Sequence, residues 1–142
     1  MSKEYHYIVN PSVVAENEAV AREAYEWGDF IFCFLLIHTL IEALLRTFLG
    51  RTGKDRFADL IDAYKNYLKE EKQPEPVFVD ELIQFNRRRN QLVHGLWKNG
   101  YAETNKKLEP SCRAAFIMFG LLIEWFETFD TEITESGFSY ES

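Results

Sequence analysis

The sequence predicts an all-α protein, an up-and-down bundle of about five helices in one domain. Apolar residues recur at three- and four-residue spacing through most of the chain, which is the period of a helix with one buried face. Residues that start and stop helices separate these segments. A length of 142 residues suits a single domain, and 46% hydrophobic residues with 12 Phe supply its core.

The boundaries of the helices follow from capping residues. Ser12, after Pro11, is the expected N-cap of the first helix, and Asp29 caps the second. Asp55 is expected to cap the third helix, and a polar connector without helix is expected over 100–109. Fraying is expected over 131–135, an N-terminal arm over 1–11 and a loose tail over 136–142. The expected helices run from residue 11 to the break at 28–29, then over 30–49, 56–72, 77–98 and 110–131.

The second helix, Phe30–Leu49, is hydrophobic nearly all round. Such a helix packs against its own bundle on one side and needs a second apolar surface to cover its other side. A homodimer interface is the simplest explanation for that second surface. His38, Glu42 and Arg46 step by four residues on one face. They follow the apolar run too soon for a membrane span, so no membrane contact is expected.

The segment 85–97, FNRRRNQLVHGLW, places polar residues where a plain bundle helix would carry leucine. Asn86 and Arg89 interrupt the apolar face of its helix, and Asn90 lies on the shoulder of that face. Burying an unpaired guanidinium costs several kcal/mol. Arg89 must therefore be paired with an acid or face a wet cleft. Arg87 and Arg88 point elsewhere, toward solvent.

His94 lies five residues after Arg89, about 140° away around a regular helix. The two side chains therefore flank the edges of one groove, with Asn90 between them, and Gly95 leaves room for a second backbone or a ligand. A two-fold axis would bring two such Arg/His pairs into one cleft. We therefore expect a homodimer with this helix at its interface.

The run from Arg89 to Gly95, RNQLVHG, resembles the R-x4–6-H motif of the HEPN superfamily, including the polar residue directly after the arginine. The resemblance extends over residues 11–131. HEPN domains are small, all-α and usually dimeric, and they include metal-independent RNases of toxin–antitoxin, abortive-infection and RNA-guided CRISPR systems. In one subgroup a partner nucleotidyltransferase modifies a tyrosine two positions after the histidine; here that position is Leu96.

The resemblance implies an endoribonuclease whose nucleophile is the 2′-OH of the RNA. His94 would act as general base or acid, Arg89 would clamp the scissile phosphate, and Asn90 would hold His94 and the backbone. Products with 2′,3′-cyclic phosphate ends follow from this chemistry. Residues expected to guide the flanking RNA strand are Arg87, Arg88 and Lys98. Supporting positions are His38, Glu42, Arg46 and Asn86.

A structural interpretation of the same residues stays open at this point. Arg89 would bridge to an acid such as Glu42, Glu42 would pair with Arg46, and His94 would be a hydrogen-bonded interface residue. In a functional interpretation, Glu42 or His38 reaches the cleft and orients Arg89 or His94. The domain would then be a ribonuclease, a non-cleaving RNA- or nucleotide-binding module, or a dimeric interaction domain.

Composition bounds the partners. The formal charge is −7, but residues from Ala114 onward hold six acids and no Lys or Arg, so the rest of the chain is nearly neutral. Three histidines without zinc-ligand spacing predict no metal site, and no cofactor is expected. Cys33 and Cys112 are expected to be reduced core thiols of a cytoplasmic protein. Expected partners are RNA, a second copy, and an antitoxin or nucleotidyltransferase.

Overall fold

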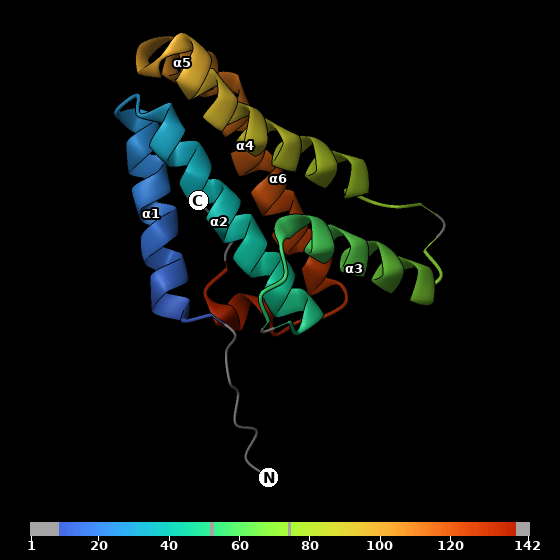
Figure 1. Cartoon of the computed structure of the whole chain (residues 1–142). Coiled ribbons are helices and arrows are strands. Elements are labelled where there is room, and N and C mark those ends of the chain that lie inside the picture. The colour runs from blue at the N-terminus through green and yellow to red at the C-terminus, as the bar shows by residue number, and fades with distance from the viewer. Residues whose placement is uncertain (1–8, 52, 74, 139–142) are drawn as a thin grey trace.

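The computed structural model describes residues 9–51, 53–73 and 75–138, and these form a bundle of helices with no strand in the described ranges (Figure 1). The all-α fold class is thus confirmed. The elements are α1 (Pro11–Glu26), α2 (Phe30–Leu49), α3 (Phe57–Glu70), α4 (Val79–Asn99), α5 (Tyr101–Lys107), α6 (Glu109–Glu127) and the 3-10 helix η1 (Ile133–Ser136).

The second helix is bounded by the residues that the sequence indicates. The Asp29 carboxylate accepts a hydrogen bond from the Phe32 amide at 3.4 Å, and Gly50 ends the helix in the left-handed conformation at φ 68°. The N-cap of α1 differs from the prediction. It is Asn10 and not Ser12, because the Asn10 side chain accepts from the Ser12 amide at 2.8 Å.

The connector predicted over 100–109 is wrong, because most of it forms α5. The side chain of Asn105 explains why so short a polar helix is stable. Its amide group donates to the Gly28 carbonyl at 2.8 Å, and its oxygen accepts from the Ile31 amide at 3.0 Å. These tertiary bonds fasten α5 to the α1–α2 turn, which local periodicity could not show.

Two other boundaries are corrected. The N-cap of α3 is Arg56 and not Asp55, and the Arg56 amide donates to the Asp59 carboxylate at 3.0 Å. The tail is ordered as far as the described chain goes, because Ser136 and Phe138 are buried and η1 replaces the expected frayed helix end. Residues 1–8 of the expected arm and 139–142 of the tail lie outside the described residues.

The core is organised around α2, which packs against all the other elements of the described chain (Figure 1). This explains its composition, since its own bundle covers it on several sides. By length and hydropathy α2 is the one helix among the described residues that could cross a membrane, and half of that stretch is buried inside the bundle. Its exposed apolar side chains are Phe32 and Leu35. Cys33 and Cys112 are free and buried, as predicted.

Candidate functional site

The polar face of α4 borders a hollow of about 470 Å³ whose other walls come from α2 and the start of α3. Five of the residues predicted for the site lie in this hollow, which is called the Arg89 cleft below. The contact of α2, α3 and α4 with one another brings together residues that are far apart in the sequence. The cleft is lined by His38, Glu42, Arg56, Phe57, Ala58, Asn86, Arg89 and Asn90.

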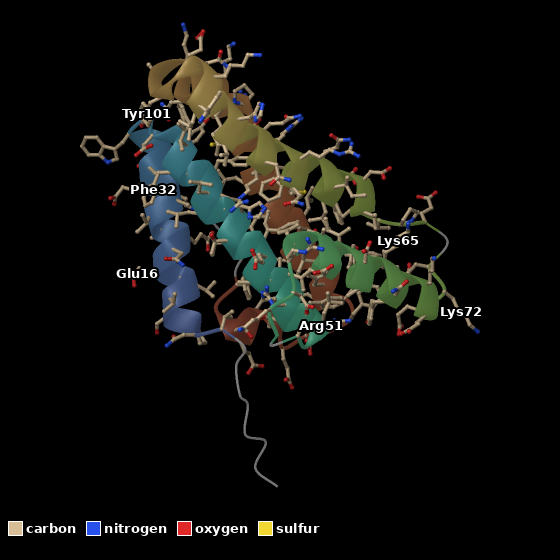
Figure 2. The ribbon with its side chains drawn as sticks, viewed as in Figure 1. Glu16, Phe32, Arg51, Lys65, Lys72 and Tyr101 are labelled. Atoms are coloured by element: carbon tan, nitrogen blue, oxygen red, sulfur yellow. The ribbon has the colours of Figure 1, made fainter. Side chains whose placement is uncertain are left out.

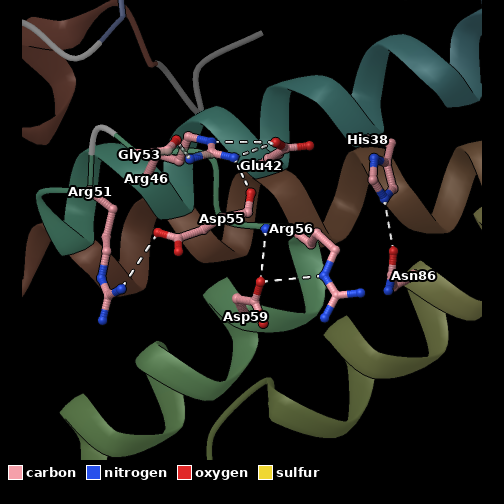
Figure 3. A network of polar contacts seen from close by, with 9 residues as sticks. All are labelled: His38, Glu42, Arg46, Arg51, Gly53, Asp55, Arg56, Asp59 and Asn86. Carbon is pink, nitrogen blue, oxygen red and sulfur yellow. Dashed lines mark hydrogen bonds and ion pairs between the residues drawn. The ribbon is translucent and has the colours of Figure 1, made fainter.

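His38 forms the buried floor of the cleft. Only 6% of it is exposed, and its ring packs against those of Phe57 and Phe85, with centroids 4.4 and 5.2 Å away. Its Nε2 is hydrogen-bonded to Oδ1 of Asn86 at 3.2 Å (Figure 3). Burial lowers the pKa of His38, the Asn86 hydrogen bond raises it less, and nearby Arg89 lowers it further. His38 is therefore a neutral support that fixes the Asn86 amide.

Glu42 is neutralised by Arg46, as the structural interpretation predicts. Their side chains meet at 3.0 Å, and the Arg46 guanidinium also donates to the carbonyls of Gly53, at 2.8 Å, and Asp55 (Figure 3). Arg46 thus ties α2 to the loop that leads into α3 and does not line the cleft. Because the Glu42 charge is balanced, it weakens the attraction of the cleft for an anion only slightly.

Arg89 is exposed and forms no ion pair within the described ranges. The alternative in which Arg89 bridges to Glu42 is therefore wrong, because Glu42 pairs with Arg46 instead. The sequence allows Arg89 either to pair with an acid or to face a solvent-filled cleft, and the structure has the second arrangement. Asn86 and Asn90 lie on the same wall, so one guanidinium and two amides face the same hollow.

Arg56 is a lining residue that the sequence does not indicate. It precedes α3, its side chain is 83% exposed, and it approaches the Asp59 carboxylate only at 3.5 Å. The side chain therefore adds a second guanidinium to the cleft, opposite Arg89. Local spacing carries no signal for this, because the contact depends on how α3 packs against α4.

The remaining motif residues are not brought into the cleft. His94, Arg87 and Lys98 are exposed elsewhere on α4, and Arg88 lines hollows on the side of α6. The expectation that Arg89 and His94 flank the edges of one groove therefore does not hold within one chain, because an offset of about 140° on the helix turns His94 away from the cleft. A single chain thus holds the arginine and the histidine of the motif on different faces of α4.

The positive charge of α4 lies beyond its first turn, which is acidic. Asp80 and Glu81 are its acids, and from Leu82 to Asn99 the helix carries three arginines, one lysine and no carboxylate. The whole chain has a formal charge of −7, but this stretch of α4 makes a locally basic surface. Acidic residues farther away than about 10 Å are largely screened by salt, so they reduce its positive potential only slightly.

Exposed apolar side chains lie on both helices that wall the cleft, Phe32 and Leu35 on α2 and Val93 and Trp97 on α4, and these four are called the apolar patch below. Leu35 is seven residues from Glu42 and Val93 is four from Arg89, so these two share the helix faces of the cleft residues. Trp97 is 88% exposed, which is unusual for so large an apolar ring. Tyr101 is also exposed, at the end of the bundle where α5 begins (Figure 2), and its hydroxyl donates to Asp29 at 3.1 Å.

No protein-family model, curated protein sequence or solved structure matches the chain. The described residues contain no group of three or more His, Cys, Asp or Glu side chains that could hold a metal ion. Both the HEPN resemblance and the chemistry of the site therefore rest on the residues of α4 and their surroundings.

Proposed function

We propose that this protein is a HEPN-type endoribonuclease that cleaves RNA without a metal ion and acts as a homodimer. The supporting observation is Arg89, an exposed guanidinium that has no carboxylate partner in the described part of the chain and lines a hollow beside two amides. The planar donor fork of arginine fits the oxygens of a phosphodiester. Arg87 is also exposed on α4, but only Arg89 lines this cleft beside the Asn86 and Asn90 amides.

The roles of the cleft residues follow from their positions. Arg89 holds the scissile phosphate and offsets the negative charge that grows on it as the 2′-OH attacks. Asn86, whose orientation His38 fixes, and Asn90 donate hydrogen bonds to the same group. His94 takes the proton from the 2′-OH or protonates the leaving 5′-oxygen, since an imidazole can serve as general base or general acid.

A second copy of the chain completes this site. His94 does not line the cleft of its own chain, so the histidine that serves one Arg89 comes from the other copy. The apolar patch of Phe32, Leu35, Val93 and Trp97 lies on the two helices that wall the cleft and would supply surface for such an interface. Burying this apolar surface in the dimer would favour association by roughly 25 cal/mol for each Å² removed from water.

A non-cleaving RNA-binding module is the second candidate, favoured by the placement of His94 outside the cleft. In that case Arg89, Asn86 and Asn90 would bind a phosphate and no proton would be transferred. A hollow of about 470 Å³ also lies within the usual size range of nucleotide-sized ligand sites.

The test is an RNA-cleavage assay in EDTA with wild type, Arg89→Ala, His94→Ala and, as a matched control, Arg113→Ala on the exposed surface of α6. We expect cleavage with 2′,3′-cyclic phosphate ends by wild type and Arg113→Ala, and a loss of at least 100-fold, the lower end for a general acid–base group, in the other two. RNA binding without cleavage by every variant would select the second candidate. Equal cleavage by all four would remove the motif from the account.

A further inference from the structure

Arg56 lines the Arg89 cleft, yet the proposed cleavage uses Arg89, Asn86 and Asn90 and leaves Arg56 without a role. Arg56 is the N-cap residue of α3, on the wall opposite α4, and its side chain is 83% exposed. In Figure 3 this side chain extends from the start of α3 toward the side of the cleft that carries Asn86. A guanidinium that is both exposed and directed at the cleft can contact a ligand that enters from solution.

Contacts on two sides restrain Arg56 although its side chain is exposed. Its backbone amide donates to the Asp59 carboxylate at 3.0 Å, and its Nε lies 3.5 Å from the same oxygen. Directly before it, the carbonyl of Asp55 accepts a hydrogen bond from Arg46. Because Nε is the atom that faces Asp59, the two terminal amino groups of Arg56, which have no acceptor within the described ranges, are left to bind a ligand.

The charges that line the cleft favour an anion. Arg56 and Arg89 are its cationic lining residues, and Glu42 is the one carboxylate among the described lining residues. Arg46 balances the charge of Glu42, and Asp59 does not line the cleft. An anionic ligand therefore meets two guanidiniums, whose planar donor forks match the oxygens of a phosphate group.

The size and layout of the cleft indicate that the two arginines bind different phosphates. A volume of about 470 Å³ lies in the range of pockets that hold drug-sized ligands, which are larger than one phosphate group. Arg89 shares its wall with two amides that can bind the same phosphate, whereas Arg56 lies on the opposite wall. Consecutive phosphates of a strand are separated by one nucleoside, so a strand with one phosphate at Arg89 offers the next one farther along the cleft.

We propose that Arg56 binds the phosphate next to the one at Arg89, so that the cleft holds a single RNA strand by two consecutive phosphates. Arg56 is then a specificity-determining residue outside the R-x4–6-H motif, because it favours ligands with two phosphate charges over ligands with one. This inference rests on the proposed binding of RNA at Arg89 and does not depend on cleavage.

The test compares two ligands of equal length. The first is a 2′-O-methyl trinucleotide, which has two phosphodiesters and no 2′-OH nucleophile, so it reports binding alone. The second is the same trinucleotide with a neutral methylphosphonate in place of one phosphodiester. Affinities are measured by titration of wild type, Arg56→Ala, Arg89→Ala and, as a matched control, Arg51→Ala. Arg51 is an exposed arginine of the same loop that does not line the cleft.

We expect Arg56→Ala to weaken binding of the doubly charged trinucleotide about five- to tenfold, as for one charged contact at an exposed site, and to leave binding of the singly charged one nearly unchanged. Arg89→Ala should weaken binding of both ligands, and Arg51→Ala of neither. Arg56→Gln keeps a long side chain without the charge and should act as Arg56→Ala does. A variant that misfolds would lose both ligands, so a loss confined to the doubly charged ligand cannot come from lost structure.

The possible failures are distinguishable. If Arg56→Ala and Arg56→Gln bind both ligands as Arg51→Ala does, Arg56 binds no phosphate and the inference is overturned while the role of Arg89 stands. If both Arg56 variants keep the wild-type thermal midpoint and lose affinity for the two ligands equally, the two arginines hold one phosphate and the inference is again overturned. Binding that Arg89→Ala leaves unchanged, or no binding by wild type, would overturn the proposed function and this inference together.

Discussion

The imidazole of His38 on α2 lies 3.2 Å from the side-chain oxygen of Asn86 on α4, across 48 positions of sequence. This hydrogen bond joins the most buried polar side chain of the cleft to a half-buried amide that faces it. A buried ring packed against both Phe57 and Phe85 has little freedom, so the Asn86 amide is held before any ligand arrives.

The His38 environment predicts a pH dependence of stability. Because burial lowers its pKa in the folded state from an ordinary value of 6.5, the unfolded chain binds the proton more readily. Stability should therefore be full above about pH 6.5 and fall as the pH drops below it. Denaturant unfolding between pH 5 and 7.5 should show this fall in wild type and a shallower one in His38→Phe. His94→Gln, on the exposed face, should behave as wild type; an equal slope in all three would contradict the role of His38.

The ion pair between Glu42 and Arg46 predicts that removing Arg46 lowers both the stability of the fold and the affinity for RNA. Arg46→Met removes the partner of Glu42 and two bonds to the loop before α3, which should cost about 2 kcal/mol of unfolding free energy. It also leaves an unbalanced carboxylate at the cleft, so RNA affinity should fall. Glu42→Gln combined with Arg46→Met should recover part of both losses in a double-mutant cycle. Additive losses would show that the pair does not influence the cleft.

The end of the described chain predicts a contrast between two glycines. A Cβ on Gly137 would lie 2.5 Å from the Pro11 carbonyl, at a φ of 100°, while Gly28 has a φ of 81° and open space. Gly28→Ala should cost about 1 kcal/mol for the backbone alone. Gly137→Ala should cost clearly more, because Phe138 must leave its buried site. Similar thermal midpoints for the two variants would mean that the tail does not pack on α1.

The apolar patch predicts the oligomeric state. Trp97→Glu places a charge in the proposed interface and should shift the chain from dimer to monomer in analytical ultracentrifugation. Trp27→Glu, at another highly exposed ring, should leave the mass unchanged. A wild type that is monomeric at all concentrations would contradict the shared site.

The shared site also predicts complementation. Arg89→Ala and His94→Ala should each be inactive alone, yet a mixture should regain roughly a quarter of the wild-type rate per chain, since half of the dimers would be mixed and each would hold one intact site. The control is Arg89→Ala alone, taken through the same unfolding and refolding steps as the mixture, which should stay inactive. No recovery from the mixture, with exchange shown by mass, would place both residues of a site in one chain.

Periodicity and capping predicted the fold where the signals are local. Asp29 and Gly50 bound α2 as predicted, because an N-cap and a left-handed glycine act on adjacent backbone. The helix α5 was missed because its stability depends on the bonds of Asn105 to the α1–α2 turn, more than 70 residues away. The ordered end at Phe138 was missed for a similar reason, since burial against distant elements decides it.

In the candidate site too, residues placed by local helix geometry were predicted, and residues placed by packing between helices were not. Helix geometry identified Asn86, Arg89 and Asn90 as one polar face, and the structure places all three in the cleft. It left two choices for Glu42, and the contact with Arg46 decides between them. Arg56 could not be predicted, because only the packing of α3 on α4 brings it to the cleft.

The central claim is that Arg89 binds the phosphate of an RNA strand. The most direct measurement is the affinity of a single-stranded RNA for wild type, Arg89→Ala and Arg87→Ala at two salt concentrations. We expect Arg89→Ala to lose about 10- to 100-fold, as for removal of one charged hydrogen-bonding group, with a smaller salt dependence, and Arg87→Ala to lose much less. Equal affinities for Arg89→Ala and wild type would contradict the account.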